Sequence, residues 1–366
     1  MTYTTRTEGC DSLRDALVST LAGSFEQHGF RRSEDVNGLQ FVLNLTNAAA
    51  PTPYRRRSQS VFVISVLSIP GPPADLRSFC YASLVRSLSN LAVAIVPPRP
   101  DHRRLDGCEI YFTTPEAGFY HLPYEANAVF ERVFPIATAH YATNNDLVPD
   151  LPERYWHGSA AVEDVRLHGA VLDRMGVLPL PFPLDSVLSP DELHHLYKIF
   201  GMTGLSYGNL SARERVSEFS NGSFWMTARG CNKARLQGAG RDVLMVREFD
   251  FDRGIAHVSM PPEGEPRARV SVDAVEHALI YETYPGVGAI VHVHAWMDDI
   301  VCTPQNFPCG TRELAEEVSR LLDDTPDPSR AVIGLKNHGI TVTGPTLADI
   351  FERFQGRLKT TVPMFS

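Results

Sequence analysis

Hydrophobic and polar residues follow one another along this chain in patterns that predict both helices and strands. In the first half, apolar residues recur every three or four positions in some stretches, as on the buried face of a helix, and form short runs in others. These patterns predict, in order, a helix over residues 11–27, strands at 39–45 and 60–68, a helix over 76–91 and a strand at 108–112. This order is consistent with a small α+β sandwich, and no motif within it indicates chemistry.

A change in composition separates this region from the rest of the chain. Residues 176–190 contain four prolines, which is typical of an extended linker because proline fixes its own backbone and restricts the residue before it. We therefore expect an α+β N-terminal domain over residues 1–175, a proline-rich linker over 176–190 and a second domain over 191–366.

The second domain is expected to be α/β, with a mixed sheet and flanking helices. Its first helix, residues 191–202, follows Ser189-Pro190, a normal helix start. Ser271 is expected to be the N-cap of the helix that follows it. The remaining pattern predicts strands at 224–227, within 243–259, at 289–294 and at 332–338, and helices after 271, from 311 and over 347–354.

Two histidines lie one residue apart at the end of the apolar run 289–294. Because side chains alternate along a strand, His292 and His294 point to the same side and are able to hold one metal ion together. A later run ends in His338-Gly339, where glycine permits a sharp turn. Three imidazoles without an obvious fourth ligand would leave an open coordination position, as catalytic metal sites do. The alternative is ordinary hydrogen-bonded core histidines, and the first pair alone does not decide between the two.

Composition narrows the range of partners and compartments. The net charge is −9, and the one basic cluster, residues 55–57, indicates a solvated loop or a local anion contact, so we expect no nucleic-acid binding. No apolar stretch approaches the roughly 20 residues that span a bilayer, and the N-terminus lacks the apolar core of a signal peptide, so we expect a cytoplasmic protein without membrane contact. Six scattered cysteines without a CxxC pair indicate neither a thiolate zinc site nor disulfides.

Six motifs occur in order within the second half of the chain, at residues 208–213, 227–230, 271–281, 292–294, 310–314 and 337–339. They begin with Gly208-Asn209-Leu-Ser-Ala-Arg213 and end with Asn337-His338-Gly339. In this order they resemble the class II aldolase/adducin family, whose members include sugar-phosphate aldolases and a ribulose-phosphate epimerase. The resemblance covers roughly residues 185–366, and residues 1–175 lie outside it.

The resemblance implies a three-layer α/β/α domain around a mixed, largely antiparallel sheet, assembled as a homotetramer with a small-molecule substrate. It implies a divalent metal, most often Zn²⁺ with Mn²⁺, Fe²⁺ or Co²⁺ as alternatives, held by His292, His294 and His338. The family's acid/base glutamate falls on Asp273. Its contacts to phosphate or other polar substrate groups fall on Asn209, Thr227, Gly230 and Ser271.

The acid/base position departs from the family pattern. Asp273 is one methylene shorter than glutamate, and an aspartate in a first helical turn is also explained by the helix dipole alone. Glu276, one turn further on, is a weaker substitute for the acid/base group. His277 is better explained as a residue that braces the helix than as a ligand.

The substrate segments depart from the family as well. Arg229 stands within the phosphate motif, where it would grip a carboxylate or phosphate with two hydrogen bonds, unless it is a solvent-facing loop residue. Val272 replaces a serine, and the loop 295–309 is shorter than in the aldolases. Trp296, Asp298, Asp299, Gln305 and Asn306 lie in this loop and are candidates to line the pocket.

The sequence therefore predicts a metal-dependent carbon–carbon lyase in carbohydrate metabolism that cleaves a small oxygenated anion by a retro-aldol step. Such a metal would bind neighbouring substrate oxygens and stabilise the enediolate, while a carboxylate moves protons. Epimerisation, decarboxylation or iron-dependent oxidation on the same three histidines are alternatives. A non-catalytic, adducin-like scaffold is another alternative, although it has no need of a metal site.

Overall fold

The computed structural model describes residues 1–366 except 59, 179–182, 195–206 and 220–221. The chain forms two compact units. The first comprises Met1–Ala139, Phe182–His194 and Met364–Ser366, and the second comprises His140–Pro181 and His195–Pro363. Among the described residues, no helix has the length and apolar character needed to cross a membrane.

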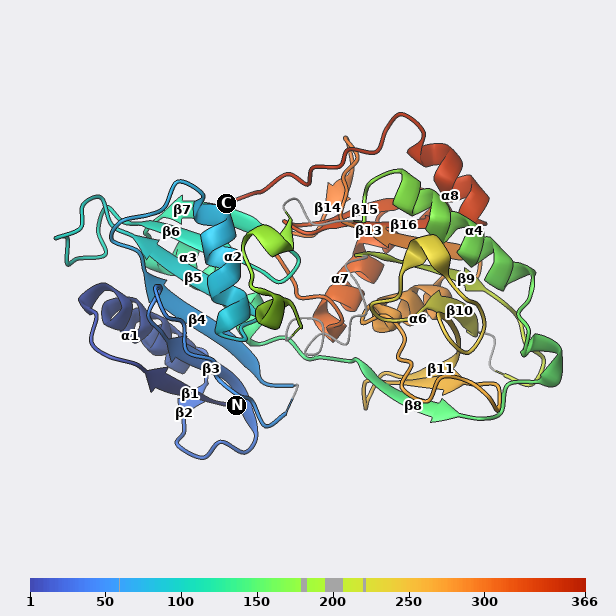
Figure 1. The fold of residues 1–366 in the computed structure, drawn as a ribbon, viewed down its shortest axis with the longest axis horizontal. Helices are drawn as coiled ribbons and strands as arrows, with labels where there is room; N and C mark the ends of the chain where they lie inside the picture. The colour runs from blue at the N-terminus through green and yellow to red at the C-terminus, as the bar shows by residue number, and fades with distance from the viewer. Residues whose placement is uncertain (59, 179–182, 195–206, 220–221) are drawn as a thin grey trace. The chain divides into compact units, whose positions relative to one another are not determined.

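The first unit is a seven-stranded mixed sheet with helices on both faces. Its strand order is β2-β1-β3-β4-β5-β6-β7, parallel from β2 to β5 and antiparallel from β5 to β7. The strands are β1 Thr2–Thr7, β2 Arg31–Arg32, β3 Leu39–Leu45, β4 Phe62–Ser68, β5 Leu91–Val96, β6 Glu109–Thr113 and β7 Phe119–Pro123, and the helices are α1 Ser12–Gln27, α2 Leu76–Arg86 and α3 Ala126–Ala137. Figure 1 shows α2 on one face and α3 on the other.

The aromatic core of this unit explains why α1 and α3 pack side by side. Phe25 of α1 is fully buried, with its ring centroid 4.3 Å from that of Phe41 in β3 and 5.0 Å from that of Phe130 in α3. The expected helix over 76–91 is too long. It ends at Arg86 because Leu88 takes a left-handed backbone (φ 56°), and Leu91 then begins β5. The sequence patterns did not identify β1, β5, β7 or α3.

The second unit is built on a nine-stranded, largely antiparallel sheet in the order β14-β15-β16-β13-β9-β10-β11-β12-β8. Only the pairs β14/β15 and β12/β8 are parallel among the described strands. The strands are β8 Asn144–Val148, β9 Asn209–Arg213, β10 Phe224–Thr227, β11 Val243–Asp250, β12 Ile255–Ser259, β13 Ala289–Val293, β14 Val301–Cys302, β15 Val332–Leu335 and β16 Gly339–Gly344, and the helices are α4 Ala160–Arg174, α6 Ala274–Thr283, α7 Arg312–Asp323 and α8 Leu347–Phe354.

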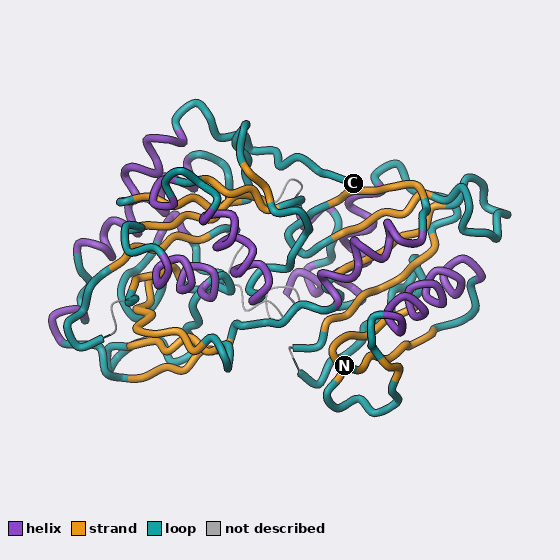
Figure 2. The backbone as a smooth tube through the Cα atoms, turned by 180° about the vertical axis from the view of Figure 1, so that it is seen from behind, coloured by secondary structure: helices purple, strands orange, loops and turns teal. Residues whose placement is uncertain are grey.

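Helices cover both faces of this sheet, which gives the unit three layers. Successive residues of β9 face opposite sides: Ser211 contacts His277 of α6, whereas Ala212 lies beside α4. Helix α4 packs with α8, and α6 packs with α7. Figure 2 shows the helices in purple against the orange strands. The predicted α/β class with mixed sheets is thus confirmed.

The structure divides the chain earlier than the prolines indicate. Residues 140–175, expected in the N-terminal domain, belong to the second unit. The reason is backbone pairing, since β8 extends the large sheet along β12, with Asn144 opposite Ile255. Helix α4 then covers β9 and β10. Of the expected helix 191–202, residues 191–194 are helical and the rest lies outside the described residues.

The helix after Ser271 begins later than expected. Its cap residue is Asp273, and α6 starts at Ala274, so the assignment of Ser271 as the N-cap is wrong. The physical reason is that the Ser271 amide still donates to the carbonyl oxygen of Thr227 at 3.2 Å, which keeps this residue paired with the end of β10.

Glycine allows the turn after His338 to lie against strand β13. A Cβ placed on Gly339 would lie 2.3 Å from the carbonyl oxygen of Val293 and 3.1 Å from the Cα of His294. No side chain is accommodated at such distances without backbone movement. Asn337, two residues earlier, takes a left-handed backbone (φ 60°), which asparagine tolerates better than most residues.

We expect Gly339→Ala to destabilise the protein by about 1–3 kcal/mol, because the backbone of β13 or of the turn must shift. Urea unfolding measures this change. Gly286→Ala is the matched control, since a Cβ there would meet only the Cβ of Ser329, at an ordinary 3.5 Å. Equal free energies of unfolding for the two variants would show that the close approach to Val293 has no energetic consequence.

Candidate metal centre

Three imidazole rings converge where β13 ends and β16 begins. The ring centroid of His338 lies 4.8 Å from the centroids of both His292 and His294, and those two are 5.3 Å apart. The Nε2 atoms of His294 and His338 are only 3.1 Å apart. The three predicted histidine rings therefore lie together, as the strand spacing indicated; their role as metal ligands stays a prediction.

The arrangement favours neutral imidazoles, which is the form that binds metals. Burial lowers the pKa of His294 and His338 well below the ordinary value, and the neighbouring His292 adds to this effect. His292 lies with its Nδ1 3.1 Å from the carbonyl oxygen of Ile340, so that Nδ1 donates and the Nε2 lone pair is left for the cluster. That Nε2 is buried and has no hydrogen-bond partner within the described part of the chain. A bound cation would satisfy it, so these residues fit a divalent metal.

Asp273 occupies the N-cap position of α6, but its side chain bonds to Asn209 instead of capping the helix. Its carboxylate accepts a hydrogen bond of 2.6 Å from the Asn209 side-chain amide, and with the described residues it makes no capping bond to α6. Asn209 lies opposite His292 in the pairing of β9 with β13. Asn209 therefore links the Asp273 carboxylate to the strand position of His292. This geometry disfavours capping as the explanation of Asp273.

Residues 227–230, which match the family's phosphate motif, lie on a backbone segment that is hydrogen-bonded to the segment carrying Ser271. Thr227 ends β10 with its hydroxyl accepting from the Leu210 amide at 3.3 Å, and Gly230 has a left-handed backbone (φ 67°) that favours glycine. Ala228 bridges to Val270 and the Ser271 amide bonds to Thr227, so the two segments lie side by side. Whether they contact a substrate stays a prediction.

Arg229 is directed into the protein, so the interpretation as a solvent-facing residue does not fit. Its Nη2 donates to the carbonyl oxygen of Thr143 at 3.4 Å, and its Nε is buried without a hydrogen-bond partner among the described residues. Burial lowers the pKa of this guanidinium, an effect that the negative charge of Asp273 opposes.

Two further residues of the site were missed by the sequence patterns. Cys309 lies with its Sγ 3.2 Å from Nε2 of His338, although an isolated cysteine in a loop gave no signal. Lys233 is only 2% exposed, in a polar segment typical of a surface loop. Burial lowers its pKa, whereas the charges of Cys231 and Asp273 oppose that shift. A buried lysine next to a carboxylate would have been found only from the packing.

Glu276 and His277 of α6 are buried behind the cluster. The Thr341 hydroxyl donates to Glu276 at 2.6 Å, but burial and the neighbouring Asp273 raise the pKa of this carboxyl to about 8. His277 lies with Nδ1 2.7 Å from the Ser211 hydroxyl, which also contacts the Tyr281 hydroxyl at 2.8 Å. These contacts fit the expectation that His277 braces the helix.

Backbone pairing and an ion pair hold the loop 295–309 in place. Trp296 bridges to Lys359, whose ammonium pairs with Asp298 at 2.6 Å, and β14 pairs with β15. Among the loop residues expected as pocket candidates, Trp296 and Asn306 are buried, whereas Asp298 and Asp299 are exposed.

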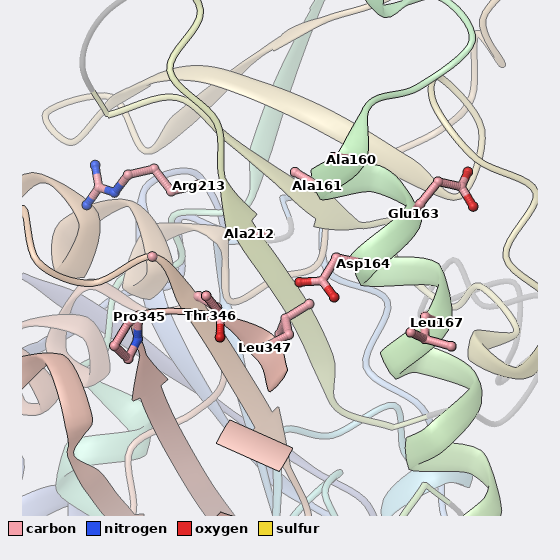
Figure 3. A pocket seen from close by; sticks show the side chains of 12 residues that line it. Ala160, Ala161, Glu163, Asp164, Leu167, Ala212, Arg213, Pro345, Thr346 and Leu347 are labelled. Atoms are coloured by element: carbon pink, nitrogen blue, oxygen red, sulfur yellow. The ribbon is translucent and has the colours of Figure 1, made fainter. Parts of the chain in front are cut away.

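A pocket of about 660 Å³ lies elsewhere on the second unit, between α4 and the beginnings of β13 and α8. Figure 3 shows Asp164 and Leu167 of α4 facing Leu347 across it, with the Arg213 guanidinium directed away. Asp164 already pairs with His168 at 2.9 Å, and Arg213 donates to the backbone oxygens of Val287 and Tyr281. The pocket and the histidine cluster lie at opposite ends of β13 and are separate features.

Comparison with known proteins identifies the class of this domain. Residues 192–356 match the family model described as the Class II Aldolase and Adducin N-terminal domain. This match confirms, over residues 192–356, the resemblance of the ordered motifs to the class II aldolase and adducin family. The residues before 192 lie outside the match.

Two curated relatives are L-fuculose phosphate aldolases from strains of Methanococcus maripaludis. They are 27% and 28% identical over 110 residues, which is 24% of this chain and 55% of each relative. The chain thus spans about half the length of the curated relatives it matches. Among solved structures, an L-fuculose 1-phosphate aldolase has 18% identity and a TM-score of 0.35, covering 54% of this chain and 81% of that one. YgbL from Klebsiella pneumoniae, described as an aldolase/epimerase/decarboxylase, has 19% identity and a TM-score of 0.33, covering 53% and 83%.

The buried carboxyl of Glu276 predicts a pH-dependent stability for the chelator-treated protein. Because its pKa is raised to about 8 in the folded state, the folded protein holds a proton that the unfolded chain releases above its ordinary pKa of 4.5. Stability is therefore fully present below about pH 4.5 and falls as the pH rises through 8.

Glu276→Gln has nearly the shape of the protonated, uncharged glutamate, and its side chain does not titrate. We expect the variant to gain stability over the wild type as the pH rises from 5 to 8, by about 1.4 kcal/mol for each unit of pKa shift at most. Urea unfolding at several pH values measures the difference. Glu316→Gln, an exposed position on α7, is the matched control. Parallel pH curves for wild type and Glu276→Gln would contradict the buried neutral carboxyl.

Proposed function

We propose that the second unit is a divalent-metal-dependent carbon–carbon lyase that cleaves a small oxygenated anion by a retro-aldol step. The observation that carries the proposal is the convergence of His292, His294 and His338, with a buried Nε2 of His292 that has no partner among the described residues. The match of residues 192–356 to the Class II Aldolase and Adducin N-terminal domain supports the same chemistry.

In this proposal the three histidines hold the metal, with Zn²⁺ as the first choice and Mn²⁺, Fe²⁺ or Co²⁺ as alternatives. The metal would supply a Lewis acid that chelates neighbouring carbonyl and hydroxyl oxygens and stabilises the charge that develops when the carbon–carbon bond breaks. Asp273 takes the role of acid and base. Its hydrogen bond from Asn209 orients one carboxylate oxygen and leaves the other to exchange a proton with the substrate.

The charge distribution around the site supports an anionic substrate. The Arg229 guanidinium lies in buried surroundings near Asp273, whose carboxylate already accepts a hydrogen bond from Asn209. Burying a cation is costly unless an anion is nearby. A phosphate or carboxylate of the substrate, placed against Thr227, Gly230 and Ser271, would balance this charge.

We also propose that the protein acts in the cytoplasm as a homo-oligomer on a substrate of carbohydrate metabolism. The six cysteines are all free thiols, which supports a reducing compartment. The family resemblance favours a tetramer, for which the oligomeric mass in solution is the test.

The decisive experiment combines metal analysis of the purified full chain with a screen of ketose phosphates, sugar acids and aldol acids, in which mass spectrometry detects the cleavage products. Two fragments whose masses sum to that of the substrate support the lyase. An isomer of unchanged mass indicates an epimerase, and loss of carbon dioxide indicates a decarboxylase. An oxygenated product with bound iron indicates an oxidation.

For the metal site, we expect His294→Ala to lose most of the bound metal, because the remaining two imidazoles hold a divalent ion weakly. Elemental analysis of metal per chain measures this loss. His157→Ala, at an exposed histidine of the same unit, should keep the wild-type metal content. If the wild type holds no stoichiometric metal and His294→Ala changes neither stability nor ligand binding, the enzyme proposals fail together and a scaffold is favoured.

For the substrate, we expect Arg229→Ala to raise KM by roughly 10- to 100-fold, which is the range for losing a hydrogen bond between two charged groups. Steady-state kinetics on the substrate found in the screen measures it. Arg253→Ala is the matched control, since this arginine side chain is 70% exposed. A KM unaffected by Arg229→Ala, in a variant that folds normally, would exclude the anion contact.

A further inference from the structure

Cys309 lies where a fourth ligand of the histidine site would lie. Its Sγ is 3.2 Å from Nε2 of His338, and the donor atoms of His292, Cys309 and His338 all lie within 4.8 Å of one another. In a tetrahedral zinc site, bond lengths of about 2.3 Å to sulfur and 2.0–2.1 Å to nitrogen place sulfur and nitrogen about 3.5 Å apart. The cysteine therefore requires only a small adjustment to share a metal with His338.

The neighbouring nitrogen atoms fit the same geometry. Two imidazole nitrogens on a tetrahedral zinc lie about 3.4 Å apart, and the Nε2 atoms of His294 and His338 are separated by 3.1 Å. A second, independent observation is the Nε2 of His292, which belongs to a side chain that is 2% exposed and has no hydrogen-bond partner among the described residues. A metal between these atoms would satisfy it.

The chain around Cys309 holds the thiol in place. Gly310 has a left-handed backbone (φ 70°), and its carbonyl oxygen accepts from the Ala142 amide at 2.9 Å. A Cβ at Gly310 would lie 2.7 Å from the Thr143 side chain, so glycine is required for this close turn. Thr311 then caps the twelve-residue helix α7, by accepting from the Leu314 amide. The sulfur thus sits on a fixed turn rather than on a free loop.

We propose that Cys309 binds the metal as a thiolate and is the fourth protein ligand of the substrate-free site; this rests on the proposed metal centre. The thiolate would bring a negative charge to a metal held by imidazole nitrogens, whereas the carboxylate of Asp273 is already bonded to Asn209. A soft sulfur ligand favours Zn²⁺ over Mg²⁺ or Mn²⁺.

This ligand has a consequence for the reaction. Four protein ligands close a zinc site, whereas catalysis needs a position for the substrate oxygens. Substrate binding must therefore displace the sulfur or raise the coordination number of the metal. Cys309 thus makes the resting site differ from one that has only three histidines.

Cobalt substitution of the full chain tests the assignment, with Co²⁺ as the probe. A thiolate bound to Co²⁺ gives an intense sulfur-to-metal charge-transfer band in the near ultraviolet, which imidazole and carboxylate ligands do not give. We expect the wild type to bind one Co²⁺ per chain with this band, and Cys309→Ser to lose the band. Cys302→Ser is the matched control, because this cysteine lies in β14 and outside the cluster.

The possible results distinguish the proposal that Cys309 is a ligand from the proposal that the three histidines bind a metal. One Co²⁺ per chain without the band in the wild type overturns the thiolate and leaves the three-histidine site standing. A wild type that binds no Co²⁺ overturns both proposals. Loss of the band in Cys302→Ser but not in Cys309→Ser assigns the sulfur elsewhere.

If Cys309→Ser does not fold, alkylation of the wild-type thiols provides a second readout. Peptide mass spectrometry then follows Cys309 and Cys302 with and without Co²⁺. Protection of Cys309 alone by Co²⁺ supports the proposal, and equal labelling of Cys309 in both conditions overturns it.

Discussion

Strand β13 is hydrogen-bonded along both edges, and the placement of His292, Asp273 and Glu276 relative to one another depends on this pairing. Its register sets His292 opposite Asn209 on one side and opposite Thr341 on the other. Asn209 in turn holds Asp273, and Thr341 holds Glu276. A slip of one residue would turn both histidines to the opposite face of the sheet. The apolar residues between the polar ones prevent such a slip, because they must remain in the core.

The second constraint is electrostatic. The face of the sheet that carries the histidines also buries Asp273 and Glu276, which are both at most 5% exposed. Removing so many polar groups from water is costly, and hydrophobic residues at these positions would give a more stable protein. The free-energy cost of burying these polar groups is concentrated beside the three histidines, where burial favours the neutral imidazoles. This concentration of destabilising groups is typical of a site selected for chemistry rather than for stability.

Local patterns were sufficient for part of this description. The spacing of two histidines on a strand and the glycine after the third follow from backbone geometry alone, so their convergence was predictable, and the ordered motifs identified the family. The proximity of Cys309 to His338 and the burial of Lys233 were not predictable, because both arise from contacts between segments far apart in the chain. Strand β8 was missed for a related reason, since only two of its five residues, Leu147 and Val148, are apolar and it joins the sheet by pairing with β12. The prolines of residues 176–190 predict a domain boundary from the sequence alone. The pairing of β8 with β12, which sets the actual boundary, leaves no such signal in the sequence.

The placement of β8 also determines how this protein can be divided. A truncated chain that begins after the prolines would retain all the family motifs but would lose β8 and α4. The backbone edge of β12 from Ile255 to Ser259 would then be exposed, together with the apolar surfaces of β9 and β10 that α4 covers. Unpaired edges and uncovered sheet faces are sites of aggregation. The smallest soluble form of the second unit should therefore start near residue 140, well before the segment that the family comparison matches.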